Sequence, residues 1–210
     1  MIVAIDGPAA SGKSSVAKEV ARRLNFTYID SGAMFRALTF WALDQALDKE
    51  EELLPLLESL TIKSLDGGIE LNGRELYHEL RIKKVDESVS YYSAMASVRE
   101  KLKEVQRQEA KEANVIMDGR DIGSCVFPEA EVKIFLTASV EERAKRRFLQ
   151  RSNKMSYEEI LEDIRRRDAY DTTREIAPLV MARDALLLDT SSLSLEETID
   201  KVEEIIKNVS

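Results

Sequence analysis

The chain has 210 residues, of which 44% are hydrophobic, and a formal net charge of −8 at pH 7. This length and apolar content suffice for one α/β core, and the negative charge argues against a nucleic-acid binder. No apolar run reaches the about 18 residues of a membrane-spanning helix, so we expect no membrane partner. Because Asp6 and Gly7 interrupt the first apolar run too early for a signal peptide, we expect a cytoplasmic protein.

Cysteine and histidine each occur once, as Cys125 and His78. A single cysteine excludes an internal disulfide, and the pair leaves too few ligands for a Cys/His zinc site. A Ser-His-Asp triad would have to use His78, which lies in a polar, hairpin-like segment unsuited to that role. We expect Cys125 to pack as a small apolar side chain. The chemistry must therefore come from other residue types.

A phosphate-binding pattern opens the chain. The apolar run Ile2–Ile5 predicts a strand buried on both faces, and Gly7–Ser14 fits G-x-x-x-x-G-K-[ST] directly after it. Glycine lets backbone N–H groups approach a polyphosphate, and the N-terminus of the helix predicted over 12–24 favours the anion. Lys13 is expected to reach the β- and γ-phosphates, and Ser14 to coordinate Mg²⁺. The predicted nucleotide-binding residues are Gly7, Ala9, Ala10, Ser11, Gly12, Lys13, Ser14 and Ser15.

A second short strand is predicted at 27–29, before a helix pattern that runs through Trp41. Either Asp30 or Ser31 can cap the start of that helix. Farther along, the charge run at 48–52 predicts a solvated turn and the start of another helix.

The sequence from Thr61 to Gly73 has a different character. Short β-prone runs alternate there with Asp-Gly-Gly and Asn-Gly turns, which predicts a small antiparallel sheet. Helical patterning resumes after Val85. We place this insertion at about 61–96, within a single domain whose core comprises residues 1–60 and 97–210.

Later helix starts are marked by Ser-x-x-Glu capping boxes, whose serines are Ser97, Ser139, Ser156 and Ser194. Among them lie three apolar runs of strand length, at 115–117, 132–136 and 185–188. With the first two strands they make five strands that alternate with helices. This order predicts an α/β fold, the three-layer α/β/α sandwich of P-loop NTPases with a five-stranded parallel sheet.

The turn Asp118-Gly119-Arg120-Asp121 follows the third of these strands directly. Ligands of open parallel sheets bind beyond the carboxyl ends of the strands, so these polar residues are candidates for the site. Asp118 is placed like the second-shell Mg²⁺ ligand of a Walker B strand. The alternative is a solvated turn whose charges pair with each other.

Two groups of arginines come next, at Arg143, Arg146, Arg147 and Arg151 and at Arg165, Arg166, Arg167 and Arg174. A single arginine on a helix is ordinarily solvated or paired with an acidic neighbour. Together, and separated by the polar segment 150–155, they predict a mobile lid at about 147–158. Such a lid would carry arginines onto a triphosphate and exclude water.

The chain contains four distinctive motifs: GPAASGKSS from Gly7, DSGAMFR from Asp30, DGRDIG from Asp118 and RRRDAYDTTREIAPL from Arg165. They resemble the bacterial cytidylate kinases of the nucleoside monophosphate kinase family, over essentially the whole of residues 1–210. The resemblance implies transfer of the γ-phosphoryl group of ATP to CMP or dCMP, giving ADP and CDP or dCDP, with ATP and Mg²⁺ as cofactors. It implies a monomer whose partners are the small-molecule substrates CMP and dCMP.

The resemblance also assigns residues. Acceptor binding, in part through the insertion, falls to Ser31, Arg36, Ser90, Arg99, Arg120, Asp121, Arg167, Asp171 and Arg174. The implied catalytic residues are Lys13, Arg120, Arg167 and Arg174. No general base is needed, because the attacking phosphate oxygen is already ionised at pH 7. Where this chain has Ser14-Ser15, other members of the family can have Gly-Thr. The resemblance therefore leaves open which of the two serines holds the metal.

Three rival functions remain open. Another P-loop small-molecule kinase, such as an adenylate or shikimate kinase, would differ in its acceptor site. A GTPase is disfavoured because the chain lacks an Asn-Lys-x-Asp motif. A non-catalytic ATP-binding module would have no use for two arginine groups.

Overall fold

The structure, a computed structural model, describes residues 1–111, 113–150 and 155–209. The predicted lid at about 147–158 is thus only partly described, and Arg151 lies outside the described residues. Within the described residues, no helix is long and apolar enough to cross a membrane.

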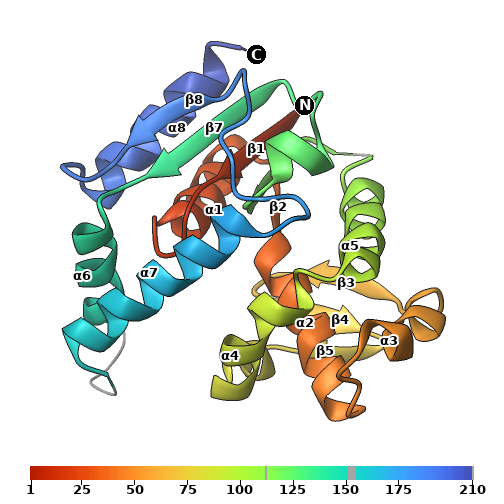
Figure 1. The fold of residues 1–210 in the computed structure, drawn as a ribbon. Coiled ribbons are helices and arrows are strands. Elements are labelled where there is room, and N and C mark those ends of the chain that lie inside the picture. Colours follow the sequence, from red (N-terminus) through yellow and green to blue (C-terminus); the bar gives the residue numbers. More distant parts are fainter. Residues whose placement is uncertain (112, 151–154, 210) are drawn as a thin grey trace. The chain divides into compact units, whose positions relative to one another are not determined.

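The chain divides into two compact units. Figure 1 shows the fold with colours that follow the residue number. The first unit combines Met1–Tyr28 with Ala113–Ser210, and the second is Ile29–Glu112. The second unit includes all of the predicted insertion at 61–96 and extends beyond both of its ends, because flanking helices pack against the small sheet.

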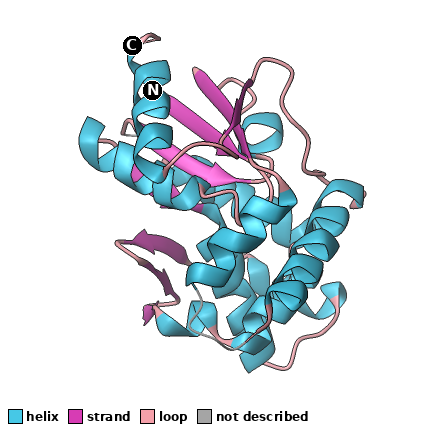
Figure 2. Cartoon of the chain, turned by 90° about the vertical axis from the view of Figure 1, so that its left-hand side faces the viewer, coloured by secondary structure: helices cyan, strands magenta, loops and turns pink. Residues whose placement is uncertain are grey.

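The first unit is built on a five-stranded parallel sheet with the strand order β2-β6-β1-β7-β8. Its strands are β1 (Ile2–Asp6), β2 (Thr27–Asp30), β6 (Val115–Gly119), β7 (Val132–Thr137) and β8 (Leu186–Asp189). They run side by side as magenta arrows in Figure 2. This pairing confirms the predicted five-stranded parallel sheet. Val3 and Ile5 of the central strand are wholly buried, as expected for a strand covered on both faces. Because β8 lies at the edge, Leu186 and Leu187 are exposed despite their apolar character.

The helices of this unit are α1 (Lys13–Leu24), α6 (Val140–Gln150), α7 (Tyr157–Thr173), α8 (Leu195–Lys207) and the short π-helix η2 (Ile122–Val126). Helices α1 and α8 lie side by side, and Val20 and Val202 join the strands in one apolar core. Helices α6 and α7 pack on each other through Ala144 and Ile164. Helix α1 is thereby held against the sheet, and α6 and α7 are held to each other.

Three of the four predicted serine caps are present. The hydroxyls of Ser139, Ser156 and Ser194 each accept a hydrogen bond, at 3.2 Å, from the backbone N–H three residues later. The prediction for Ser97 is wrong, because Met95 is the N-cap of α5 (Ala96–Glu109). The Ser97 N–H instead donates to Glu50 at 2.7 Å, so an acceptor from another helix replaces the local cap.

The second unit contains the predicted antiparallel sheet and the helices around it. Its strands are β3 (Ile62–Leu65), β4 (Gly68–Leu71) and β5 (Arg74–Leu76), paired in the order β3-β4-β5. Its helices are α2 (Ser31–Asp44), α3 (Glu50–Leu57), α4 (Lys83–Tyr92), α5 and the 3-10 helix η1 (His78–Arg81). Asp30 rather than Ser31 caps α2, because its carboxylate accepts from the Ala33 N–H at 2.9 Å.

Candidate active site

The loop between β1 and α1 is shaped by two glycines. A Cβ on Gly7 would lie 2.1 Å from the carbonyl oxygen of Leu136 in β7, so only glycine fits there. Gly12, the N-cap of α1, has a φ of +90°, which also favours glycine. The Ser11 hydroxyl is buried in this loop with no hydrogen-bond partner among the described residues. A phosphate oxygen fits as its missing partner, beside the positive end of α1.

Lys13 lies folded over the loop. It is only 5% exposed, and its Nζ donates to the carbonyl oxygen of Pro8 at 3.0 Å. Burial, followed by repulsion from Arg120, lowers the pKa of the amino group, whereas Asp118 opposes this. An anion bound in the loop would stabilise the charged amino group.

The carboxylate of Asp118, at the end of β6, lies beside the first turn of α1. Its Oδ2 accepts a hydrogen bond from Ser14 Oγ, and its Oδ1 accepts one from Tyr28 Oη, both at 2.7 Å. Such hydroxyl and carboxylate oxygens suit Mg²⁺, which prefers oxygen ligands. The described residues hold no cluster of three or more acidic, histidine or cysteine side chains fit for a metal. A magnesium ion here would therefore need further oxygens, such as those of a bound phosphate.

Four of the residues expected to bind the acceptor form one charged cluster in the first unit. Arg120 Nε donates to Asp171 Oδ2 at 2.8 Å, and Arg174 Nη1 lies 3.9 Å from Asp171 Oδ1. Arg174 Nη2 also donates to Asp121 Oδ1 at 3.5 Å. Arg174 and Asp121 are nearly buried, with side chains 5% and 7% exposed. The two carboxylates hold the two guanidinium groups in place.

Arg167 adds positive charge beside this cluster. Burial, followed by repulsion from Arg120 and Arg147, lowers the pKa of its guanidinium, and Asp163 and Asp171 oppose this effect. Several arginines in a partly buried region favour the binding of an anion. Arg120 is also close enough to the lysine of the loop to lower that pKa, so the cluster and the loop share one electrostatic environment.

Arg143 of α6 and Asp168 of α7 hold the loop at the Ala9 peptide. Arg143 Nη1 donates to the Ala9 carbonyl oxygen at 3.0 Å and lies 2.6 Å from Asp168 Oδ2. The Ala9 N–H donates to Asp168 Oδ1 at 3.4 Å. Arg143 Nε donates in addition to the carbonyl oxygen of Ala138 at 2.9 Å. Apart from the presence of the two charges, nothing in the sequence indicated this contact.

Arg146 has a similar role one turn farther along α6. Its guanidinium donates to the carbonyl oxygens of Ser11 at 3.4 Å, Thr190 at 2.6 Å and Leu193 at 3.4 Å. Arg143 and Arg146 therefore contact the backbone of the loop at Ala9 and Ser11, and their role of facing a triphosphate stays a prediction.

Asp6, the last residue of β1, shapes the turn after β6. Its carboxylate accepts hydrogen bonds from the N–H groups of Ile122 at 2.8 Å and Gly123 at 2.7 Å. Burial raises its pKa to about 6, although these two hydrogen bonds oppose the shift. An aspartate at the end of an otherwise apolar strand was the signal in the sequence that could have identified it.

The remaining predicted acceptor residues lie in the second unit. Ser31 opens α2 and is 3% exposed, and Arg36 lies in the same helix, with Nε 3.5 Å from Asp86 Oδ1 of α4. Ser90 is also in α4. Arg99 of α5 donates to the Ser93 carbonyl oxygen at 2.9 Å, and its guanidinium lies over the ring of Phe35, 5.3 Å from the centroid. Because α2 packs on both α4 and α5, the unit gathers the four predicted residues on three adjoining helices.

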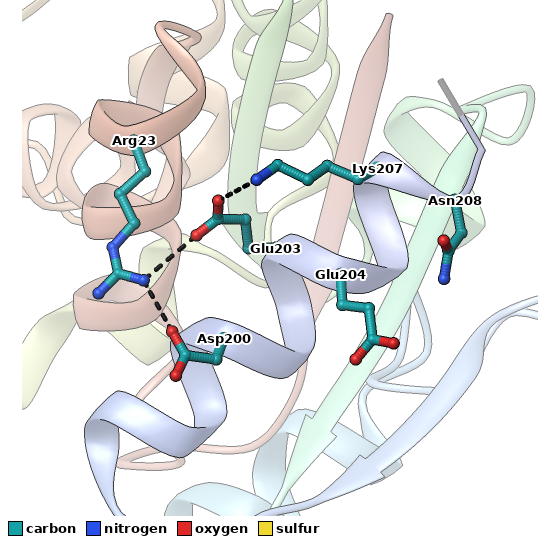
Figure 3. A pocket seen from close by; sticks show the side chains of 6 residues that line it. All are labelled: Arg23, Asp200, Glu203, Glu204, Lys207 and Asn208. Atoms are coloured by element: carbon teal, nitrogen blue, oxygen red, sulfur yellow. Dashed lines mark hydrogen bonds and ion pairs between the residues drawn. The ribbon is translucent and has the colours of Figure 1, made fainter.

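A hollow between α1 and α8 carries a separate group of charges (Figure 3). Arg23 Nη1 donates to Asp200 at 2.8 Å and to Glu203 at 3.2 Å, and the same guanidinium binds Glu19 and Glu196. This arginine joins the two helices, and none of the predicted site residues lines the hollow.

Comparison with known proteins identifies the family. The family model described as cytidylate kinase matches residues 3–208. A cytidylate kinase of Carboxydothermus hydrogenoformans is 49% identical, with 98% of this chain and 97% of the relative covered. A cytidylate kinase of Bacillus cereus is 46% identical, with coverages of 99% and 96%.

Solved structures share the fold at low sequence identity. A shikimate kinase of Bacteroides thetaiotaomicron superimposes with a TM-score of 0.53 at 14% identity, over 99% of this chain and 98% of that one. An uncharacterized protein of Eubacterium ventriosum gives a TM-score of 0.55 at 12% identity, over 100% and 98%. These likenesses confirm the P-loop kinase fold alone. The family match and the close relatives show that the chain belongs to the cytidylate kinase family.

Proposed function

We propose that the protein is an ATP:(d)CMP phosphotransferase, which transfers the γ-phosphoryl group of Mg·ATP to CMP or dCMP and releases ADP and CDP or dCDP. The observation that carries the proposal is the partly buried cluster of Arg120, Asp171 and Arg174 in the same unit as the phosphate-binding loop. Family membership supports the same reaction. We further propose that the protein acts as a monomer in the cytoplasm.

The loop residues bind the donor in this proposal. The N–H groups around Gly7 and Gly12 and the amino group of Lys13 bind the phosphates, and Lys13 stabilises charge on the transferred group. Bound Mg²⁺ supplies neutralisation of phosphate charge. We assign Ser14 rather than Ser15 to this ion, because Ser14 Oγ donates its proton to Asp118 and keeps its lone pairs available.

The arginines bind the acceptor phosphate and the group in transfer. Two anions must approach each other, so the main contribution of the protein is to offset their repulsion and hold them in line. Arg120, Arg167 and Arg174 carry the positive charge for this, and Asp171 orients two of them. The attacking phosphate oxygen is already ionised at neutral pH, so no side chain has to remove a proton.

Recognition of the cytidine part falls to the remaining residues. We propose that the carboxylate of Asp121 binds the sugar or base and that the carboxylate of Asp171 faces the sugar. In the second unit, Ser31 and Arg36 bind the acceptor nucleotide, and Ser90 and Arg99 recognise cytosine. Arg99 is suited to this role, because its guanidinium is held by a contact with the Phe35 ring and by its hydrogen bond to the Ser93 carbonyl oxygen.

A panel of acceptors tests this function. We expect ADP release from Mg·ATP with CMP and dCMP, and little with UMP, AMP, GMP, shikimate or no acceptor. Arg120→Ala should lower kcat/KM for CMP by about 100-fold or more, the loss typical of removing a donor that stabilises transition-state charge. The control Arg22→Ala removes a 72% exposed arginine that pairs with Glu19, and should retain full activity.

Other outcomes of the panel would exclude the proposal. Turnover of shikimate or AMP alone would identify another P-loop kinase. ADP release that is equal with and without acceptor would indicate a hydrolase, and ATP binding without turnover would indicate a binding module.

A further inference from the structure

The carboxylate of Asp118 is held at both oxygens by hydroxyl groups. Ser14 Oγ donates to Oδ2 and Tyr28 Oη donates to Oδ1, each at 2.7 Å. Asp118 is only 3% exposed. Hydrogen bonds to an ionised carboxylate are among the stronger ones in proteins, and one on each oxygen fixes the plane of the group.

The position of Tyr28 is set independently of its hydroxyl. The preceding residue, Thr27, donates its N–H to the carbonyl oxygen of Asn114 at 2.8 Å, which anchors the start of β2. The ring of Tyr28 packs against the apolar core shared by the sheet, α1 and α8. A phenylalanine could make the same ring contacts, so the hydroxyl has a role that can be separated from packing.

The orientation of Asp118 decides what Ser14 can do. A serine hydroxyl can bind a cation through its lone pairs while its proton is donated elsewhere, and here Asp118 Oδ2 takes that proton. Without the bond from Tyr28, the carboxylate loses one of the bonds that orient it, and the direction of the Ser14 hydroxyl is less tightly fixed. Residues that orient a metal ligand in this way alter metal affinity without contacting the metal.

We propose that Tyr28 is a positioning residue of the magnesium site, which acts through Asp118 on Ser14. The inference rests on the proposed function, since it presumes that Mg²⁺ binds beside the loop together with a nucleotide. It adds a residue from β2, outside all four motifs of the family.

Calorimetric binding of ADP to the full chain tests the role without turnover. The quantity measured is the ratio of the ADP dissociation constant in EDTA to that in Mg²⁺. We expect Tyr28→Phe to lower this ratio by about tenfold, the lower end of the losses seen when partners of metal ligands are removed. The dissociation constant in EDTA should stay within about twofold of wild type, because the loop contacts persist.

Tyr92→Phe is the matched control. It also removes a tyrosine hydroxyl, but one in the second unit, where Tyr92 Oη donates to the Leu47 carbonyl oxygen at 2.9 Å. It should leave the ratio unchanged. In an Asp118→Ala background, the further change Tyr28→Phe should have no additional effect, because the residue through which Tyr28 acts is gone.

Each other result would overturn the proposal. An unchanged ratio in Tyr28→Phe would show that Asp118 needs no second hydroxyl. Equal weakening of ADP binding in Mg²⁺ and EDTA, or failure of Tyr28→Phe to fold while Tyr92→Phe folds, would show a structural role only. A wild-type protein that binds ADP equally with and without Mg²⁺ would overturn the premise that the ion binds beside the loop with a nucleotide. Failure of the proposed function itself would instead appear in the acceptor panel as no transfer to CMP, which distinguishes the two failures.

Discussion

The contact of Arg143 and Asp168 with the Ala9 peptide allows a quantitative prediction for the variant Asp168→Asn. The two side chains are 2.6 Å apart, and they are 7% and 21% exposed. Removing one partner of a buried pair costs about 3–5 kcal/mol, because the other charge stays buried. Arg143 keeps its bonds to two carbonyl oxygens and asparagine keeps one acceptor, so we expect a loss of about 2–3 kcal/mol. For a domain of this size that corresponds to a fall in melting temperature of about 4–12 °C.

Thermal unfolding, followed by circular dichroism, provides the assay, and Arg166→Gln is its control. Arg166 lies in the same helix and pairs with Asp163 at 2.7 Å, but it is 73% exposed. A pair of that kind contributes about 1 kcal/mol or less. Equal decreases in melting temperature in the two variants would refute the reasoning, because they would show that burial of the arginine does not increase the contribution of its ion pair to stability. We also expect Asp168→Asn to raise the KM for ATP, since the Ala9 peptide loses its contact on the N–H side.

Two further predictions concern stability. Burial raises the pKa of Asp6 from 3.8 to about 6, so in that interval the folded protein binds more protons than the unfolded chain. The contribution of Asp6 to the free energy of unfolding then falls by about 3 kcal/mol as pH rises. Asp6→Asn lacks this dependence, so urea titrations should show its free energy of unfolding rising by about 3 kcal/mol relative to that of wild type between about pH 4 and pH 7. A difference independent of pH would contradict this. Arg23→Ala should lower the melting temperature at low salt and less at about 1 M NaCl, because the acidic residues it joins then repel one another and salt screens them. Arg22→Ala, which removes a pair with Glu19 alone, should change little at either salt concentration, and equal effects of the two variants would refute the prediction.

Much of the fold could be predicted from local pattern. The apolar runs predicted the five strands of the parallel sheet, because a strand covered on both faces needs continuous apolar sequence. The turns at 66–68 and 72–73 predicted the small antiparallel sheet, with Gly67 and Gly73 at positive φ. The wrong prediction at Ser97 shows the limit of such signals, because its backbone N–H donates to the carboxylate of Glu50 in α3, and the serine is not the N-cap.

The sequence by itself determined the phosphate-binding loop and the family, because both are recognised from residues that are adjacent in sequence or at fixed spacing. Only the tertiary structure decided which partner each charge has. The bonds of Tyr28 to Asp118 and of Arg143 to Ala9 join residues about a hundred positions apart. Spacing carries no signal for such contacts, because they arise when strands and helices distant in sequence pack together. For the same reason, the bonds from Arg143 and Arg146 of α6 to backbone carbonyl oxygens could not be predicted from the spacing of the arginines.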